Sequence, residues 1–135
     1  MSSTLYPPIS RQWLRGEDDA RSGWHQVHEH LLIRGRTASS VDLALVELSG
    51  SIDADSVSAL TRAFDELIDG GAMSLHVDVS AIESLDGAGA RAFALTANAL
   101  ELRGGRFRLR RAPRPVERLL RATGLGRLLI APRMR

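Results

Sequence analysis

The fold of this chain is decided by the stretch Ile82-Glu83-Ser84-Leu85-Asp86-Gly87-Ala88-Gly89-Ala90. This stretch follows the apolar, strand-like run 75–79 and leads into a helical pattern that continues to Arg103. Asp86 stands where a helix N-cap belongs, because its carboxylate can accept hydrogen bonds from the amides of the first turn. The four small residues after it leave those amides and the positive end of the helix dipole accessible. We therefore expect a helix start that either packs tightly against a strand or admits another molecule closely.

The bulk composition is typical of a soluble globular protein. A length of 135 residues predicts one domain, with 44% hydrophobic and 25% charged residues. No apolar run is long enough to span a membrane and the N-terminus shows no secretory signal, so we expect a cytoplasmic protein. The lack of cysteine excludes disulfides, thiolate catalysis and zinc–sulfur sites.

Charge is segregated along the chain although the net charge is only +2. Residues 42–101 carry eleven acidic side chains and two arginines, whereas residues 103–135 carry eleven arginines and one glutamate. This distribution predicts an acidic and a basic region that can orient a charged partner. The arginine-rich part could bind anions or nucleic acid, but it lacks interleaved aromatic residues and a helix-turn-helix pattern. We therefore disfavour nucleic acid as the partner.

Strand-like and helix-like segments alternate, with glycines between them. Strand patterns cover 28–36, 43–48, 73–79 and 106–110. Helix patterns begin near Asp53 or Asp55, either of which could be the cap, at Asp86 and near Pro113. Residues 1–26 are predicted to form a partly ordered N-terminal arm, residues 27–131 the domain and residues 132–135 a C-terminal tail. The order of elements indicates a compact α/β fold.

The order of these elements and the glycines between them resemble those of the STAS domain, which is named for sulfate transporters and anti-sigma factor antagonists. Four segments carry the resemblance: Leu48–Asp53, His76–Asp86, Arg103–Leu109 and Val116–Leu125. The resemblance implies an α/β, STAS-like single domain in which helices pack against a four- to five-stranded mixed sheet. It also implies a non-enzymatic, cofactor-free regulator of transcription that acts by binding another protein.

The sequence departs from the family at the centre of the motif. Anti-sigma factor antagonists read Asp-Ser-(Ser/Thr)-Gly there, and the serine is phosphorylated by a kinase that is also the anti-sigma factor. Here the motif is Asp86-Gly87-Ala88-Gly89, so only Asp86 and Gly89 match. Glycine has no hydroxyl, and this chain cannot acquire the phosphate charge at position 87. Ser84 and Thr96 are the nearest hydroxyls, and we expect Ser84 to bond to local backbone rather than to serve as a substitute acceptor.

The resemblance implies docking of an anti-sigma factor or a related kinase-like regulator at this helix start. The residues expected to contact it are Asp53, Ser84, Asp86, Gly87, Ala88, Gly89 and Arg91. We predict no metal site, because capping and turn bonding account for Asp53, Asp78 and Asp86 and because His76 is expected to be packed in its strand. An alternative is a divergent STAS subunit of another assembly, such as a stressosome-like scaffold or a lipid-transport accessory. The N-terminal arm is a candidate for a homodimer contact.

Overall fold

The computed structural model describes residues 21–28, 30–38 and 42–130. Its central element is a five-stranded sheet. The strands are β1 (Arg21–His28), β2 (Leu31–Ala38), β3 (Leu43–Ile52), β4 (Ser74–Leu85) and β5 (Arg106–Arg110). They lie side by side in chain order; β1, β2 and β3 pair antiparallel, whereas β3, β4 and β5 pair parallel. The helices are α2 (Val57–Asp69), α3 (Gly87–Leu102) and α4 (Arg114–Ala122), followed by the 3-10 turn η2 (Gly126–Leu128). This arrangement confirms the predicted α/β fold with a mixed sheet.

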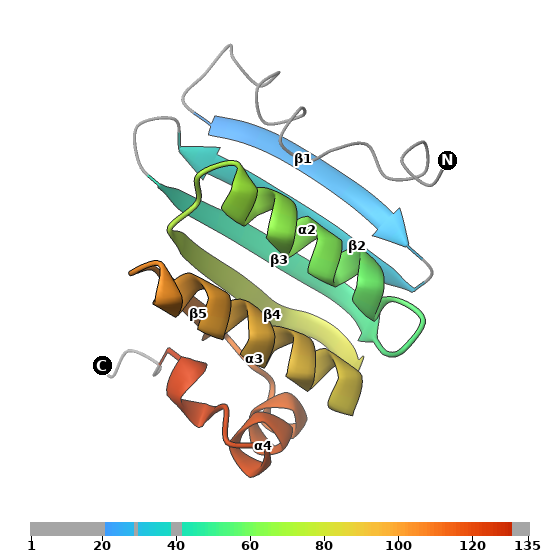
Figure 1. Ribbon diagram of the computed structural model, residues 1–135. Coiled ribbons are helices and arrows are strands. Elements are labelled where there is room, and N and C mark those ends of the chain that lie inside the picture. Colours follow the sequence, from blue (N-terminus) through green and yellow to red (C-terminus); the bar gives the residue numbers. More distant parts are fainter. Residues whose placement is uncertain (1–20, 29, 39–41, 131–135) are drawn as a thin grey trace, which may run out of the picture.

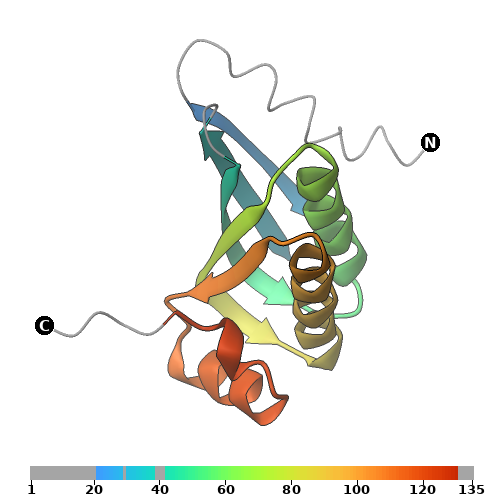
Figure 2. The ribbon, with the colours of Figure 1, turned by 60° about the vertical axis from the view of Figure 1, so that its left-hand side comes forward.

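Both crossover helices lie on the same face of the sheet (Figures 1 and 2). The helix α2 connects β3 to β4, and α3 connects β4 to β5, as parallel neighbours require. Helix α4 lies below the β5 edge in Figure 2 and buries Val116 and Leu120. Within the described chain, no helix covers the opposite face of β2, β3 and β4.

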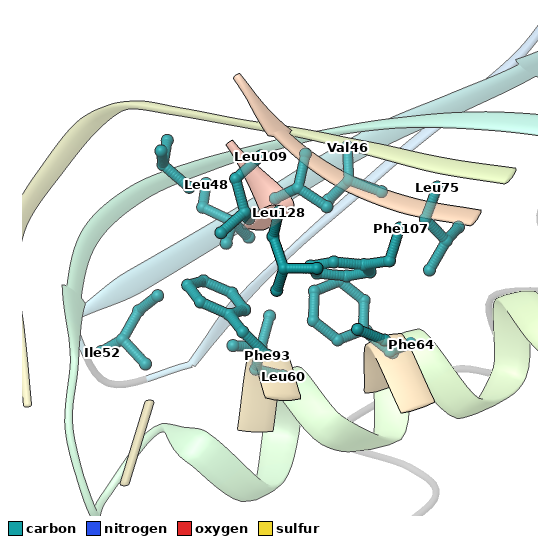
Figure 3. Packing of buried hydrophobic residues seen from close by; sticks show 14 of the residues in the cluster. Val46, Leu48, Ile52, Leu60, Phe64, Leu75, Phe93, Phe107, Leu109 and Leu128 are labelled. Carbon is teal, nitrogen blue, oxygen red and sulfur yellow. The ribbon is translucent and has the colours of Figure 1, made fainter. Parts of the chain in front are cut away.

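The core lies between the sheet and these helices. It is centred on the three phenylalanines of the chain, Phe64, Phe93 and Phe107, which come from α2, α3 and β5 and are fully buried (Figure 3). The rings of Phe64 and Phe107 meet edge to face with centroids 5.5 Å apart, and Phe93 lies 5.9 Å from Phe107. Such pairs add to the stabilisation that burial alone provides. The aromatic contacts therefore join both helices to the β5 end of the sheet.

The hairpin predicted from the two strand patterns after residue 27 is confirmed by the antiparallel pair β2 and β3. The sequence did not predict β1. Residues 21–26 were assigned to the N-terminal arm, but they form most of this edge strand, which pairs with β2 from Arg21↔Ala38 to His28↔Leu31. Gly23 and the lack of a regular alternation of apolar residues concealed it. The rest of the predicted arm, residues 1–20, and the tail at 132–135 lie outside the described residues.

Strand β4 is also longer than predicted, because it continues past Val79 to Leu85. Its alternation of buried and exposed residues breaks at Ser80 and Ala81, which are both exposed, and the pairing with β3 shifts register there. Such an irregularity removes the period-two signal without ending the strand. The strand therefore runs directly into the N-cap of α3. Among the described residues, no helix has the length and apolar character that crossing a membrane requires.

Candidate functional site

Helix α3 begins at a side-chain cap, as the sequence predicted. Asp86 has an extended backbone (φ −104°, ψ −174°), and its Oδ1 accepts a hydrogen bond of 3.1 Å from the amide of Gly89. This bond satisfies one of the amides that have no partner within the helix. The carboxylate is therefore already engaged by the chain itself, although Asp86 remains exposed.

The small residues after the cap divide into two kinds. Gly89 is buried, and a Cβ added there would lie 2.6 Å from Cγ2 of Ile52 and would also overlap Leu85, so the fold requires a glycine. Gly87 is exposed, and an added Cβ would meet no atom of the described residues within 4 Å. Ala88 is half-buried between them. Tight packing thus explains Gly89, whereas no contact among residues 21–28, 30–38 and 42–130 requires the small size of Gly87.

The turn between β3 and α2 is held by a network of short-range hydrogen bonds. Oδ1 of Asp53 accepts from the amides of Asp55 (3.0 Å) and Ser56 (3.2 Å). The buried hydroxyl of Ser56 donates to the carbonyl of Ser51 (3.0 Å) and accepts from the amide of Asp53 (3.1 Å). The prediction that Asp53 or Asp55 caps the helix is therefore wrong. Ser56 occupies the N-cap position, and Asp53 instead fixes the preceding turn.

This turn and the start of α3 are joined directly. The amide of Asp86 donates a hydrogen bond of 3.2 Å to the carbonyl of Ile52, the last residue of β3. The parallel pairing also places Ser51 beside Ser84 and Ile52 beside Leu85. Because parallel strands end at the same edge of a sheet, the two strand-to-helix connections lie side by side.

Most of the residues predicted to form the site lie together at this edge. Ser84, Asp86 and Gly87 are exposed, and Arg91 is exposed one helical turn beyond Gly87. Gly89 is the exception, because it faces the core rather than solvent. The sequence reasoning missed Ser56, whose hydroxyl shapes the Asp53 turn. The spacing Asp53-Ala54-Asp55-Ser56 is typical of such side-chain-bonded turns and could have indicated it.

Two further candidate residues lie away from this edge. Oδ1 of Asp78 accepts from the amide of Ser80 (2.8 Å), and its carboxylate forms an ion pair of 3.4 Å with Nε of Arg111. His76 is half-buried and alternates along β4 with the buried Leu75 and Val77, so it lies on the sheet face away from the core. Burial lowers the pKa of His76, and the nearby arginines of β5 lower it further.

Comparison with known proteins defines the class of this fold. The family model described as "Mlab, STAS domain" matches residues 26–131. The chain therefore belongs to the STAS domain family, as the sequence motifs indicated. No curated protein matches the sequence.

Solved structures of anti-sigma factor antagonists share the fold. The unphosphorylated form of SpoIIAA gives a TM-score of 0.61 at 15% identity over 80% of this chain and 85% of that chain. An anti-sigma factor antagonist from Mycobacterium paratuberculosis gives 0.59 at 23% identity over 83% and 85% of the two chains. The phosphorylated form of the Bacillus cell fate determinant SpoIIAA gives 0.57 at 14% identity over 80% and 88%. These likenesses establish an architecture in common with anti-sigma factor antagonists.

Proposed function

We propose that this protein is a non-enzymatic regulatory module that resembles an anti-sigma factor antagonist and docks its partner at the start of α3. The contact surface comprises the exposed first turn of α3 and the adjoining turn at Asp53. The observation that carries the proposal is the contrast between two glycines in one motif. Gly89 is required by packing, whereas Gly87 meets no such requirement from the part of the chain that the structure describes.

An exposed glycine at this position favours close approach of another protein. Glycine in a helix interior costs roughly 0.5–1 kcal/mol relative to alanine, and Gly87, as the first residue of α3, costs at most this. No contact among the described residues requires its small size. Close contact with a partner backbone would account for that cost. The hydrogen bonds from Asp86 and within the Asp53 turn would hold the surface rigid before binding, which lowers the entropy cost of docking.

The same position lacks a phosphorylation switch under this proposal. SpoIIAA has a phosphorylated form, and a phosphate adds about −1.5 to −2 charges that can repel an acidic partner surface. Gly87 and Ala88 offer no hydroxyl. Docking would then be constitutive, unless a hydroxyl such as that of exposed Ser84 is modified instead.

The partner that fits best is an anti-sigma factor or a related kinase-like regulator, in keeping with the fold shared with anti-sigma factor antagonists. Segregated charge would orient the two proteins as they meet. A homodimer contact through the N-terminal arm remains part of the proposal, and the arm's first twenty residues lie outside the described part of the chain.

Capture of partners from extract of the native cells tests the proposal. Gly87→Trp should abolish capture while the melting temperature stays within a few degrees of the wild type, because the added side chain enters open space. The matched control is Ala122→Trp, which places the same bulk at an exposed residue of α4. Equal capture by the wild type and Gly87→Trp would refute docking at this edge. Stoichiometric phosphate on Ser84 after incubation with the captured kinase and ATP would refute the proposal that docking lacks phosphorylation control.

A second candidate is a STAS subunit of another assembly, such as a stressosome-like scaffold or a lipid-transport accessory. The description of the matching family model, which names Mlab rather than an anti-sigma factor antagonist, favours retaining it. The same capture experiment separates the two candidates through the identity of the recovered protein.

A further inference from the structure

The face of the sheet opposite α2 and α3 holds a depression of about 660 Å³. Its lining includes side chains from alternate positions of β2, β3, β4 and β5, which point away from the core. Leu32 and Leu45 contribute a half-buried apolar floor. Figure 2 shows that α2 and α3 lie on the other side of the sheet from this face.

Strand pairing arranges the charged residues of this face in rows across the sheet. One row consists of Arg34, Glu47, Asp78 and Arg110, which are neighbours in register on β2, β3, β4 and β5. Arg34 forms an ion pair of 3.6 Å with Glu47, and Asp78 pairs with Arg111. Each carboxylate of the row thus has one arginine partner. Arg110 has no carboxylate within 4.0 Å among the described residues.

The next row carries only basic and apolar residues. It consists of Arg36, Leu45, His76 and Arg108, again neighbours in register on the four strands. Arg36 is exposed and, within the described chain, has no carboxylate within 4.0 Å. Leu45 and His76 form the middle of the row and are half-buried.

Positive potential reaches the middle of this row. The lowered pKa of His76 reflects its burial first, and then the charges of Arg110, Arg108 and Arg106 on the adjacent strand. These arginine charges, which disfavour a proton on His76, favour an anion above it. Guanidinium groups suit this task because they can hold a phosphate or carboxylate through paired hydrogen bonds.

We propose that this sheet face binds a compact anion with an apolar portion. Arg36 and Arg110 hold its phosphate or carboxylate group over His76 from opposite sides, and its apolar portion rests on Leu45 and Leu32. The depression falls in the range of about 300–1,000 Å³ that small-molecule sites occupy. The site lies away from the α3 start and does not depend on the docking proposed there.

The acidic residues of the first row define the size of the ligand. Glu47 and Asp78 lie between the arginines of that row, so a continuous polyanion laid across the face would meet two carboxylates. Nucleic acid and an anionic membrane surface both present such a continuous array of charge. A compact anion held over His76 by Arg36 and Arg110 occupies one point of the face and does not have to extend across both carboxylates.

Nuclear magnetic resonance titration of the full chain with phenyl phosphate, in a buffer without phosphate, tests this site. We expect saturable shifts of the His76 ring signals and a rise in the His76 pKa, because an anion above the ring stabilises its protonated form. The other charged groups near the ring are the arginines of β5, Arg36, Glu47 and Asp78. Phenol, which lacks the charge, should leave the pKa unchanged, and inorganic phosphate, which lacks the apolar portion, should bind more weakly than phenyl phosphate.

Substitutions distinguish binding at this site from non-specific electrostatic attraction of an anion to the basic part of the protein. Arg36→Gln and Arg110→Gln should each weaken phenyl phosphate binding about tenfold or more, as expected for the loss of one charge-assisted contact. Arg114→Gln removes the same charge from an exposed position on α4 and should leave binding unchanged. Unsaturable shifts, or equal weakening by Arg114→Gln, would overturn the proposal. Duplex DNA or anionic vesicles could instead bind more tightly than phenyl phosphate and lose this binding in the Arg36 and Arg110 variants. That result would overturn the proposal that the ligand is compact.

Discussion

The amide of Asp86 donates a hydrogen bond of 3.2 Å to the carbonyl of Ile52, which ties the N-cap of α3 to the end of β3. Through this bond, the turn that contains Asp53 and the first turn of α3 become one surface. Its rigidity comes from local bonds, and its accessibility comes from the residues beyond the cap.

The two glycines of the motif should respond to the same substitution in opposite directions. Gly89→Ala forces a Cβ against Ile52 and Leu85, and we expect a loss of about 1–3 kcal/mol in the free energy of unfolding, as for other overpacked cores. Gly87→Ala adds a methyl group in open space and should stabilise α3 by up to about 1 kcal/mol. Urea unfolding of both variants measures the two changes. Equal effects would contradict the division between a packed and an open glycine.

Ser56 should be the most sensitive residue of the Asp53 turn. Its buried hydroxyl donates to Ser51 and accepts from the amide of Asp53, so Ser56→Ala leaves two backbone groups without these partners. We expect a loss of about 1–3 kcal/mol in the free energy of unfolding. Ser58→Ala, at an exposed residue two positions further along, in the first turn of α2, is the matched control and should change stability by less than about 0.5 kcal/mol. A neutral Ser56→Ala would show that the turn does not depend on this hydroxyl.

His76 should make stability depend on pH. Its pKa in the folded protein is lowered by burial and by the arginines of β5, so the unfolded chain binds its proton more tightly. As the pH falls below about 6.5, the unfolded state takes up more protons, and the free energy of unfolding decreases. Between about pH 7.5 and 5.5, the wild type should therefore lose more stability than His76→Gln.

The comparison of the wild type with His76→Gln cancels the contributions of the other titrating groups to the pH dependence of stability. Asp65 has a raised pKa through burial and the charge of Asp69, which acts in the opposite direction at lower pH. That contribution is common to the wild type and the variant and cancels in the difference. A larger loss in His76→Gln than in the wild type would contradict the assigned direction.

Elements that are determined by residues within one short segment could be predicted from the sequence. The Asp86 cap followed from a carboxylate before a helical pattern, and the strand pattern at 106–110 is confirmed by β5, where Phe107 and Leu109 are buried. Features that depend on contacts between distant segments were not predictable in this way. The difference between Gly87 and Gly89 arises because Ile52 and Leu85 meet beneath only one of them.

Strands β1 and β4 show why the observed strand boundaries differ from the predicted ones. Strand β1 is fixed by its backbone pairing with β2 at the sheet edge, and its sequence carries no period that would reveal it. The end of β4 is concealed by the irregularity at Ser80 and Ala81. The basic rows across the sheet likewise depend on the register of four strands, although each strand shows its own arginines in the sequence.

The most direct test of docking at α3 compares Gly87→Asp with Gly87→Asn, measured against the partner recovered by capture. The two side chains have nearly the same size, and only Asp adds the negative charge that a phosphate would bring. A negative charge at a helix start is favourable by about 0.3–1 kcal/mol, so Gly87→Asp should be no less stable than Gly87→Asn. We predict that it nevertheless binds the partner about tenfold more weakly, as expected for a charge mismatch at a close contact. Equal affinities of the two variants and the wild type would contradict docking at the start of α3.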